Sequence, residues 1–475
     1  MLFSSLLFLY AGLPLVLGVY WLLPGRWRNG WLLLASLLLY AWGGVSYSLL
    51  LLGSITVNYA LGRAIGAAGS RPRRRAWLGV GLLLNLGALG VVKYGRFAVA
   101  EANRLLELGG LPAYPLPRIL LPLGISFFTF QAVSYLVDTL REGEGAGPRE
   151  QRDGWGELGL YLAFFPQLIA GPIVRHRAMR GQIRHRPGPD WNLTARGLER
   201  FLLGLARKVL LANGLAGIVD DIFAVDYTTL DAPTAWAGLL LYALQLYHDF
   251  AGYSDMAVGL GMLFGFRLPE NFDFPYLSRS IREFWRRWHI TLGAWFRDYL
   301  YVPLGGNRGG AGRTARNLLF VFAVTGLWHG AARNFVLWGL WHGAFVVLER
   351  RRWWRFDSLL YAQAVVLLGW VLFRTESLAG AGHYYAALFG GHAGRSVPFD
   401  WAFSWDLRLT LVSLAALAFA TPLPRDLARG VLRRTTDRGR GWLAGGYALA
   451  LLVLFLLCSC ALATDTLNPF LYFRF

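Results

Sequence analysis

The chain has 475 residues, of which 55% are hydrophobic, 15% aromatic and only 16% charged. Soluble domains typically carry about 25% charged residues, and here the charges cluster between long apolar runs, which argues against an ordinary soluble enzyme. The net charge of +19 would suit a nucleic-acid partner, but the basic residues lie in short loops, as in membrane proteins. We therefore expect a polytopic all-α membrane protein whose basic loops contact membrane lipids, and no nucleic-acid partner.

The first apolar run, residues 1–23, has no charge and is long enough to cross a hydrocarbon core of about 30 Å. Arg26 and Arg28 follow this run, which predicts a retained membrane helix with its N-terminus outside. Further apolar runs lie at 31–43, 45–66, 77–94, 119–138, 156–173, 199–222, 234–265, 317–349, 357–373, 407–422 and 441–463. We expect about 11–13 crossings, some broken or re-entrant, within a single integral-membrane domain over residues 1–475.

Basic clusters between these runs indicate the orientation of the chain. The clusters at 71–75, 175–186 and 349–355 are predicted to be cytoplasmic, because arginine and lysine are enriched in cytoplasmic loops. Attraction to anionic headgroups explains such a surface. It would also attract a polyanionic donor such as a coenzyme A thioester, and charge alone does not separate the two.

The segment "LPLGISFFTFQAVSYLVD" at residues 121–138 is apolar but carries several polar side chains. Polar groups at this density are expected to face protein or a cavity rather than lipid. A second apolar run, 234–265, contains Asp249 and Asp255. Buried carboxylates in a membrane are functional candidates, and these two are equally plausible as ion-pair partners of the arginines at 282–297.

The segment "IREFWRRWHITL" at residues 281–292 predicts a basic helical face. Arg282, Arg286 and His289 follow one another at i, i+4 and i+7, and Trp285 precedes His289 by one turn. Spacing alone favours an amphipathic helix on the cytoplasmic interface. The functional alternative makes this face the binding surface of a phosphate-rich donor, with His289 nearest the membrane.

The segment "PLGGNRGGAGR" at residues 303–313 is a glycine-rich basic loop. It lacks the pattern of a nucleotide-binding P-loop. Its backbone N–H groups, together with Asn307 and Arg308, could hold a phosphate. A flexible turn between two helices explains the same composition.

Residues 317–349 form an apolar run in which the hexapeptide "GLWHGA" occurs twice. One straight helix of this length would measure about 50 Å, so we predict a break at 329–334, where irregular backbone requires a buried site. In an unbroken helix His329 and His342 would lie about 20 Å apart. His342 lies in a clean apolar run and is interpreted as forming a helix–helix hydrogen bond, whereas packing and function remain equally open for His329.

Several sequence patterns of known catalytic sites are absent from the chain. There is no His-Glu-x-x-His, no pair of Cys-x-x-Cys motifs, no Gly-x-Ser-x-Gly and no dinucleotide fingerprint. We therefore expect no metal site and no serine nucleophile. Histidine chemistry remains, because a neutral imidazole is a suitable general base for a hydroxyl acceptor.

Several long motifs give the chain a family resemblance. The stretches that carry it are "PYLSRSIREFWRRWHITLGAWFRDYLYVPLGGNRGG", "NLLFVFAVTGLWHGAARNFVLWGLWHG", "LPLGISFFTFQAVSYLVD", "FFPQLIAGPIVR", "DFAGYSDMAVGL" and the closing "NPFLYFRF". With these motifs the chain resembles the membrane-bound O-acyltransferase (MBOAT) family, and in particular its bacterial branch of alginate O-acetylation and teichoic acid D-alanylation. Ala251 and His248 depart from residues common in that branch, which bears on local packing.

The resemblance implies a ring of membrane helices around a central funnel, with the acyl donor entering from the cytoplasm. The family's defining histidine corresponds to His329 and its second signature position to His289, whereas His342 matches no catalytic position. It implies no permanently bound cofactor, because the acyl thioester is a substrate. It also implies a bacterial inner-membrane location and a periplasmic acyltransferase partner.

These observations lead to one predicted function and two alternatives. We predict acetyl transfer from a cytoplasmic thioester, acetyl-CoA, for O-acetylation of an extracytoplasmic polysaccharide such as alginate. His329 and His289 are the expected catalytic residues. His329 is expected to act as general base or to receive or position the acyl group, and His289 to orient the donor or assist proton transfer. The expected donor-binding residues are Arg282, Arg286, Asn307 and Arg308. The alternatives are D-alanyl transfer from a carrier protein to teichoic acid, and a non-enzymatic transporter or flippase of exopolysaccharide.

Overall fold

The computed structural model is helical throughout the residues it describes, and no strand occurs among them. The described residues are 3–117, 119, 121–142, 153–185, 190–350, 357–391, 399, 401, 405–434, 437–464 and 471. The predicted all-α class is confirmed. Residue 186, residues 351–355 of the expected basic loop at 349–355, and all of the closing segment 468–475 except Leu471 lie outside the described residues.

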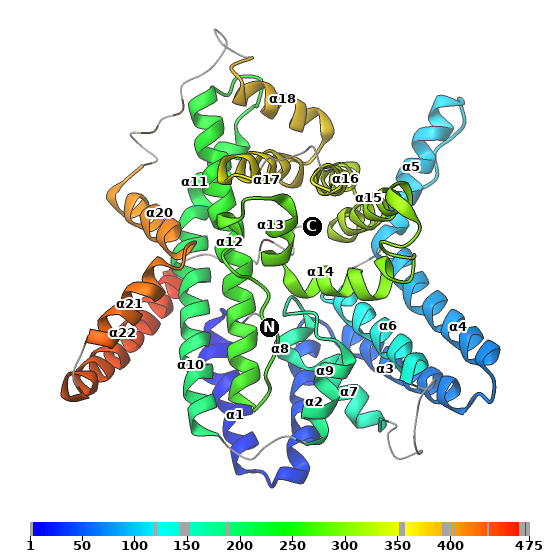
Figure 1. Cartoon of the computed structure of the whole chain (residues 1–475), viewed down its shortest axis with the longest axis horizontal. Coiled ribbons are helices and arrows are strands. Elements are labelled where there is room, and N and C mark those ends of the chain that lie inside the picture. The colour runs from blue at the N-terminus through cyan, green and yellow to red at the C-terminus, as the bar shows by residue number, and fades with distance from the viewer. Residues whose placement is uncertain are drawn as a thin grey trace. The chain divides into compact units, whose positions relative to one another are not determined.

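The chain divides into two compact units, residues 1–197 with 260–269, and residues 198–259 with 270–475 (Figure 1). The first unit contains η1 (Phe8–Gly12), α1 (Leu13–Leu22), α2 (Gly25–Ala41), α3 (Val45–Ala67), α4 (Arg71–Leu89), η2 (Gly90–Tyr94), α5 (Gly95–Leu108), α6 (Ile125–Glu142), α7 (Trp155–Ala163), α8 (Phe165–Leu168) and α9 (His176–Arg184). Two helices, α10 (Trp191–Ala206) and α12 (Ala232–Leu263), belong partly to each unit.

The second unit contains the remaining helices. They are η4 (Arg207–Ala212), α11 (Asn213–Ala224), η5 (Pro275–Leu277), α13 (Ile281–Arg287), α14 (Ile290–Phe296), η6 (Arg297–Tyr301), α15 (Gly310–His329), α16 (Arg333–Leu348), α17 (Leu359–Arg374), α18 (Leu378–Leu388), α20 (Leu407–Phe419), α21 (Leu423–Arg434) and α22 (Asp437–Thr464). The expectation of a single domain stays a prediction.

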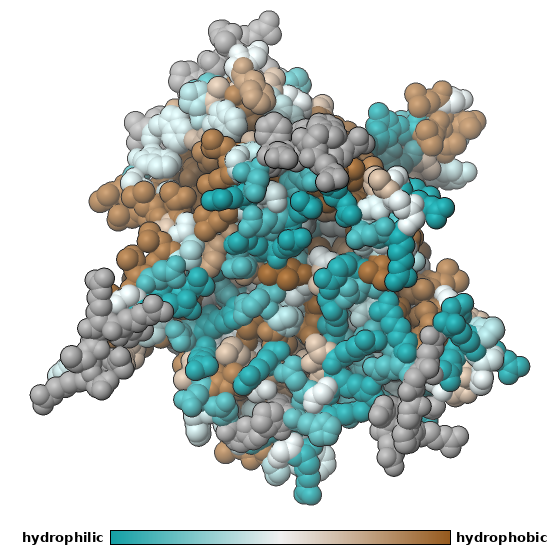
Figure 2. Space-filling view, in the orientation of Figure 1, coloured by the Kyte–Doolittle hydropathy of each residue, from teal (hydrophilic) through white to brown (hydrophobic). Residues whose placement is uncertain are grey.

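Several helices have the length and composition of membrane spans. Within the described residues four qualify, Val45–Ala67, Arg71–Leu108, Trp191–Ala224 and Gly441–Thr464, and a pair bent by 76°, Leu407–Phe419 with Leu423–Val431, adds a fifth. Hydrophobic residues gather over α20 at the left of Figure 2, as expected of a surface that faces lipid. The chain is a multi-pass membrane protein, whereas the 11–13 crossings and their ring around a funnel stay predictions.

Close packing of α6 against α3 and α4 organises the first unit. A methyl group at Gly62 would lie 2.1 Å from the Tyr135 hydroxyl, and one at Gly81 would lie 2.5 Å from Leu136, so any larger residue would require these side chains to move. Asn58 and Asn85 exchange amide hydrogen bonds of 3.1 and 2.8 Å between α3 and α4. The polar side chains of α6, including Ser126, Thr129, Gln131, Ser134 and Asp138, are buried, which confirms that they face protein.

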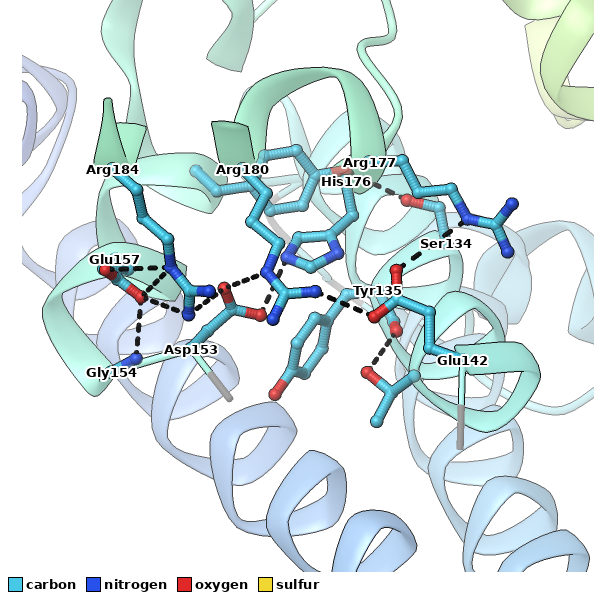
Figure 3. Close-up of polar contacts among 12 residues, drawn as sticks. Ser134, Tyr135, Glu142, Asp153, Gly154, Glu157, His176, Arg177, Arg180 and Arg184 are labelled. Carbon is cyan, nitrogen blue, oxygen red and sulfur yellow. Dashed lines mark hydrogen bonds and ion pairs between the residues drawn. The ribbon is translucent and has the colours of Figure 1, made fainter. Parts of the chain in front are cut away.

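A charged network ties α9 to the segment before α7 (Figure 3). Asp153 lies 2.9 Å from His176 Nε2 and 3.2 Å from both Arg180 and Arg184, which follow one another at single-turn spacing on α9. Burial opposes ionisation of Asp153, but the hydrogen bond from His176 and the charges of His176 and the two arginines outweigh it and hold the pKa of Asp153 below its ordinary value. This carboxylate lies outside the candidate membrane spans.

We expect the stability of this network to fall at acidic pH. A carboxyl group with a depressed pKa stabilises the folded state above its unfolded value of about 3.9, and the contribution disappears as pH falls through the folded pKa. Thermal unfolding of the purified protein between about pH 2 and pH 5 measures this loss. In Asp153→Asn the acid-dependent part should shrink, and the unfolding temperature near neutral pH should be lower. An unchanged acid dependence in this variant would contradict the assignment.

Ion pairs between α12 and the segment α10–η4 hold part of the second unit. Asp255 binds Arg200 at 2.9 Å and Arg207 at 2.7 Å. Asp249 pairs with Lys208 through one oxygen, and its other oxygen accepts the backbone N–H of Leu471 at 2.9 Å. The interpretation of these aspartates as partners of the arginines at 282–297 is therefore wrong, because their cations lie at positions 200–208.

Candidate active site

Helices α15 and α16 form an antiparallel hairpin whose turn confirms the predicted break. α15 ends at His329 and α16 begins at Arg333. A methyl group at Gly326 would lie 2.1 Å from the Phe335 carbonyl oxygen, and one at Gly339 would lie 2.1 Å from the Phe322 carbonyl oxygen. The two helices therefore cross backbone to backbone at the first glycine of each hexapeptide copy.

The repeat is longer than the hexapeptide, and packing explains its extra residues. Both copies read Phe-x-x-x-Gly-Leu-Trp-His-Gly-Ala, at residues 322–331 and 335–344. A methyl group at the second glycine of each copy would meet the phenylalanine of the other copy, Gly330 against Phe335 at 2.2 Å and Gly343 against Phe322 at 2.9 Å. The repeat thus produces a locally two-fold-like helix crossing.

This crossing places both histidines against one tryptophan. The ring centroid of Trp338 lies 5.1 Å from that of His329 and 5.2 Å from that of His342. His329 also packs on Trp328 and Phe373, with centroids at 5.0 and 5.4 Å. The separation of about 20 Å expected for an unbroken helix does not occur, because the chain reverses between the two copies.

His289 does not share a helical face with the two arginines, so that prediction is wrong. α13 ends at Arg287, and His289 adopts the left-handed conformation with φ 44° before α14 begins. His289 is buried, with 1% of the residue exposed, and its ring packs edge-on against Phe250 with a centroid distance of 4.7 Å. Its Nδ1 atom lies 3.0 Å from the amide oxygen of Asn271.

A cavity of about 520 Å³ lies between α13, α14, α15 and the end of α16. It combines three arginines with a mostly apolar wall. Its lining residues are Arg282, Trp285, Arg286, Ile290, Leu292, Gly293, Ala294, Phe296, Arg297, Tyr301, Leu318, Val321, Phe322, Thr325 and Val346. Hydrophilic residues gather over α13 and α14 near the centre of Figure 2.

The three arginines of the cavity differ in their partners. Arg282 contacts Glu349 at 3.4 Å, and Glu349 also accepts the backbone N–H groups of Ile281 and Arg282. Arg297 pairs with its neighbour Asp298 at 2.8 Å. Arg286 is exposed, and no acidic side chain of the described part of the chain forms an ion pair with it. Arg286 is therefore the most available of the three for an anionic ligand.

Trp285 connects the cavity with the buried histidines. Its ring lines the cavity and packs edge-on against Trp338 and His342, with centroid distances of 5.7 and 5.3 Å. Neither His289 nor His329 is among the residues that line the cavity. The arrangement can therefore bind an anionic ligand next to an aromatic cluster that contains histidine.

The glycine-rich loop lies beside this cavity without lining it. Gly305, Gly306, Gly309 and Gly310 have positive φ, which makes the segment a series of tight turns. Asn307 accepts a hydrogen bond from Tyr301, which does line the cavity, and Arg308 is exposed. Donor binding by Asn307 and Arg308 stays a prediction.

Some residues of the site were missed from the sequence. Asn271, Trp338 and Arg297 had no distinguishing pattern, because each depends on contacts between distant segments. The longer repeat was an available signal for the helix crossing, because its phenylalanines and glycines face each other across the two copies.

The fold is that of an all-helical membrane protein in which an arginine-lined cavity lies next to an aromatic cluster that contains histidine. The sequence model of the MBOAT (membrane-bound O-acyltransferase) family matches residues 156–375. This range includes the hairpin, His289 and all the residues that line the cavity.

The chain is similar over its length to named bacterial proteins. It is 40% identical to the probable alginate O-acetylase AlgI of Azotobacter vinelandii, over 100% of both chains. It is 43% identical to the probable alginate O-acetylase AlgI of Pseudomonas aeruginosa, over 82% of this chain and 75% of that one. It is 37% identical to the peptidoglycan O-acetyltransferase of Helicobacter pylori, over 80% and 78%. The chain belongs to the MBOAT family and is an O-acyltransferase.

Proposed function

We propose that this enzyme transfers an acetyl group from cytoplasmic acetyl-CoA for O-acetylation of an extracytoplasmic polysaccharide such as alginate. The names of the relatives support acetyl transfer to a polysaccharide. The observation that carries the donor assignment is the cavity, whose arginines suit phosphates and whose apolar wall suits the thioester arm. Trp285 joins this wall to the aromatic cluster around the histidines.

In the proposed reaction His329 acts as general base. It takes the proton of the acceptor hydroxyl, whose oxygen bonds to the acyl carbon. The carbon–sulfur bond of the thioester then breaks, and the proton returns to the thiolate, which leaves as the free thiol. His289 assists this proton transfer on the donor side. A buried neutral imidazole suits both roles, because it has one lone pair and one N–H group.

The proposed setting is the bacterial inner membrane. The basic clusters at 71–75 and 175–186 face the cytoplasm, where the donor is made, and a periplasmic acyltransferase partner passes the group to the polymer. D-alanyl transfer from a carrier protein to teichoic acid is the alternative chemistry. Transport of exopolysaccharide without chemistry is the alternative from another class.

A labelled-donor assay with the purified enzyme in lipid nanodiscs tests these options. We expect loss of the thioester from labelled acetyl-CoA, and label on polysaccharide when the periplasmic fraction is added. Transfer from a D-alanyl carrier protein with no use of acetyl-CoA would select the alternative chemistry. Movement of polysaccharide into vesicles without consumption of either thioester would overturn the enzymatic proposal.

Arg286 should contribute most to donor binding. A charge-assisted hydrogen bond to a phosphate is worth about 1.5–3 kcal/mol, so Arg286→Gln should raise the donor KM roughly tenfold or more at nearly unchanged kcat. Arg282→Gln should also lower stability, because Arg282 pairs with Glu349. Donor titrations of the assay above measure both effects.

Arg287→Gln is the matched control on the same helix. Arg287 pairs with Glu283 at 2.8 Å and does not line the cavity. Its donor KM should stay within about twofold of the wild-type value. Equal effects of Arg286→Gln and Arg287→Gln would mean that α13 acts through its general charge and not through the cavity.

A further inference from the structure

Asn271 contacts the whole turn that carries His289. Its side chain is buried, and its amide oxygen accepts the Thr291 hydroxyl at 2.9 Å and the Thr291 backbone N–H at 3.3 Å. The same oxygen lies 3.0 Å from His289 Nδ1. Its backbone oxygen accepts the N–H of Ile290 at 3.0 Å. One asparagine therefore holds three consecutive residues between α13 and α14.

The orientation of the Asn271 amide is determined by its neighbours. A backbone N–H can only donate, so the atom facing the N–H of Thr291 must be the amide oxygen. The amide nitrogen then points to Ser254, to whose hydroxyl oxygen it donates at 3.1 Å. A flipped amide would place two donors against each other at Thr291.

This orientation determines which nitrogen of His289 carries the proton. Because the amide oxygen only accepts, Nδ1 of His289 must be the N–H donor. A neutral imidazole has one N–H, so the lone pair lies on Nε2. Within the described residues Nε2 is buried and has no hydrogen-bond partner. A buried acceptor without a partner destabilises the folded protein, and a phenylalanine here would avoid that cost.

We propose that Asn271 is a positioning residue that fixes the Nδ1–H tautomer of His289 and so keeps Nε2 as a proton acceptor. This inference rests on the proposed function, in which His289 assists proton transfer. Nε2 takes up the proton that the acceptor hydroxyl has lost and releases it to the thiolate formed when the carbon–sulfur bond breaks. Nδ1–H remains bound to Asn271 throughout, so no second proton moves.

Nitrogen NMR of the protein labelled with ¹⁵N-histidine tests the tautomer without any substrate. The two nitrogens of the Nδ1–H and Nε2–H forms have different shifts, and a His289→Gln difference spectrum identifies the signals. We expect the Nδ1–H form in the wild-type protein. Asn271→Asp should keep it, because a carboxylate oxygen also accepts the Nδ1 proton, whereas Asn271→Leu should give a mixture of tautomers. An Nε2–H signal in the wild-type protein would overturn the proposal.

Kinetics then separate positioning from general destabilisation. Asn271→Leu should lower kcat roughly 10- to 100-fold with little change in donor KM, because Asn271 does not line the cavity. Asn271→Asp should recover at least a tenth of the wild-type rate. Asn85→Leu is the matched control, since Asn85 is a buried asparagine that pairs with Asn58 in the other unit. It should reduce folded protein and leave the His289 signals unchanged.

The two measurements fail in different ways. Suppose that Asn271→Leu loses the Nδ1–H tautomer while His289→Gln keeps full activity. That result would support the positioning of the ring by Asn271 and refute the proposed role of His289. Unchanged His289 signals in Asn271→Leu would refute the positioning role, whichever thioester the enzyme uses.

Discussion

Replacing His329 with alanine is expected to abolish acyl transfer while the protein remains folded. Loss of a general base typically costs about 100- to 10,000-fold in rate. His329 ends α15 at the turn of the hairpin and packs on Trp328, Trp338 and Phe373, so its removal leaves the glycine crossing intact. The measurement is acetylation of polysaccharide at equal abundance of the variant and wild-type proteins in the membrane.

His342 provides the matched comparison, because it packs on the same tryptophan in the other copy of the repeat. His342→Ala should keep at least a tenth of the activity, and any loss should follow lowered stability. His342→Phe keeps an aromatic ring but adds volume, so it should lower the free energy of unfolding by about 1–3 kcal/mol. An active His329→Ala beside a folded but inactive His342→Phe would show that the second copy carries the chemistry.

Replacing Gly326 or Gly339 with alanine should prevent stable folding of the hairpin. The added methyl group would lie 2.1 Å from a carbonyl oxygen of the facing helix, and backbone cannot move aside as a side chain can. Overpacking of a core typically costs 1–3 kcal/mol and occasionally more, and we expect a loss of at least about 3 kcal/mol here. The yield of monodisperse protein and its unfolding temperature measure the effect.

Gly312→Ala is the control for this prediction, because Gly312 lies on the same helix and nothing lies within 4 Å of an added methyl group. Alanine should be neutral or stabilise the helix by roughly 0.5–1 kcal/mol. If Gly326→Ala and Gly312→Ala proved equally stable, the two helices would not cross at the glycines.

The sequence predicted the features of this enzyme that depend on local pattern. The break after His329, the buried polar face of α6 and the arginines of α13 all follow from apolar run length and helical spacing. Such patterns are short-range, so one segment contains all the information. The family resemblance added His289 and His329 as a pair, which spacing alone left open.

Contacts between distant segments could not be predicted in this way. The helical face predicted to include His289 was wrong, because His289 itself adopts the left-handed conformation and interrupts the helix. That conformation usually requires glycine, so no sequence pattern indicated it here. The distance between His329 and His342 depends on how the two helices cross. That crossing involves contacts of Phe322 and Phe335, which lie outside the hexapeptide that the sequence pattern picked out. Asn271 became visible only when the fold brought it to the turn at 289–291.

The carboxylate of Asp249 has a consequence for the order in which the chain is assembled. Lys208 precedes it and is available as soon as Asp249 is made, whereas Leu471, whose N–H occupies the other oxygen, follows 222 residues later. At a synthesis rate of about 5–20 residues per second, this oxygen waits on the order of 10–45 s for its partner. During that interval Lys208 is already available to pair with Asp249, whereas the Leu471 N–H is made only when synthesis of the chain is almost complete.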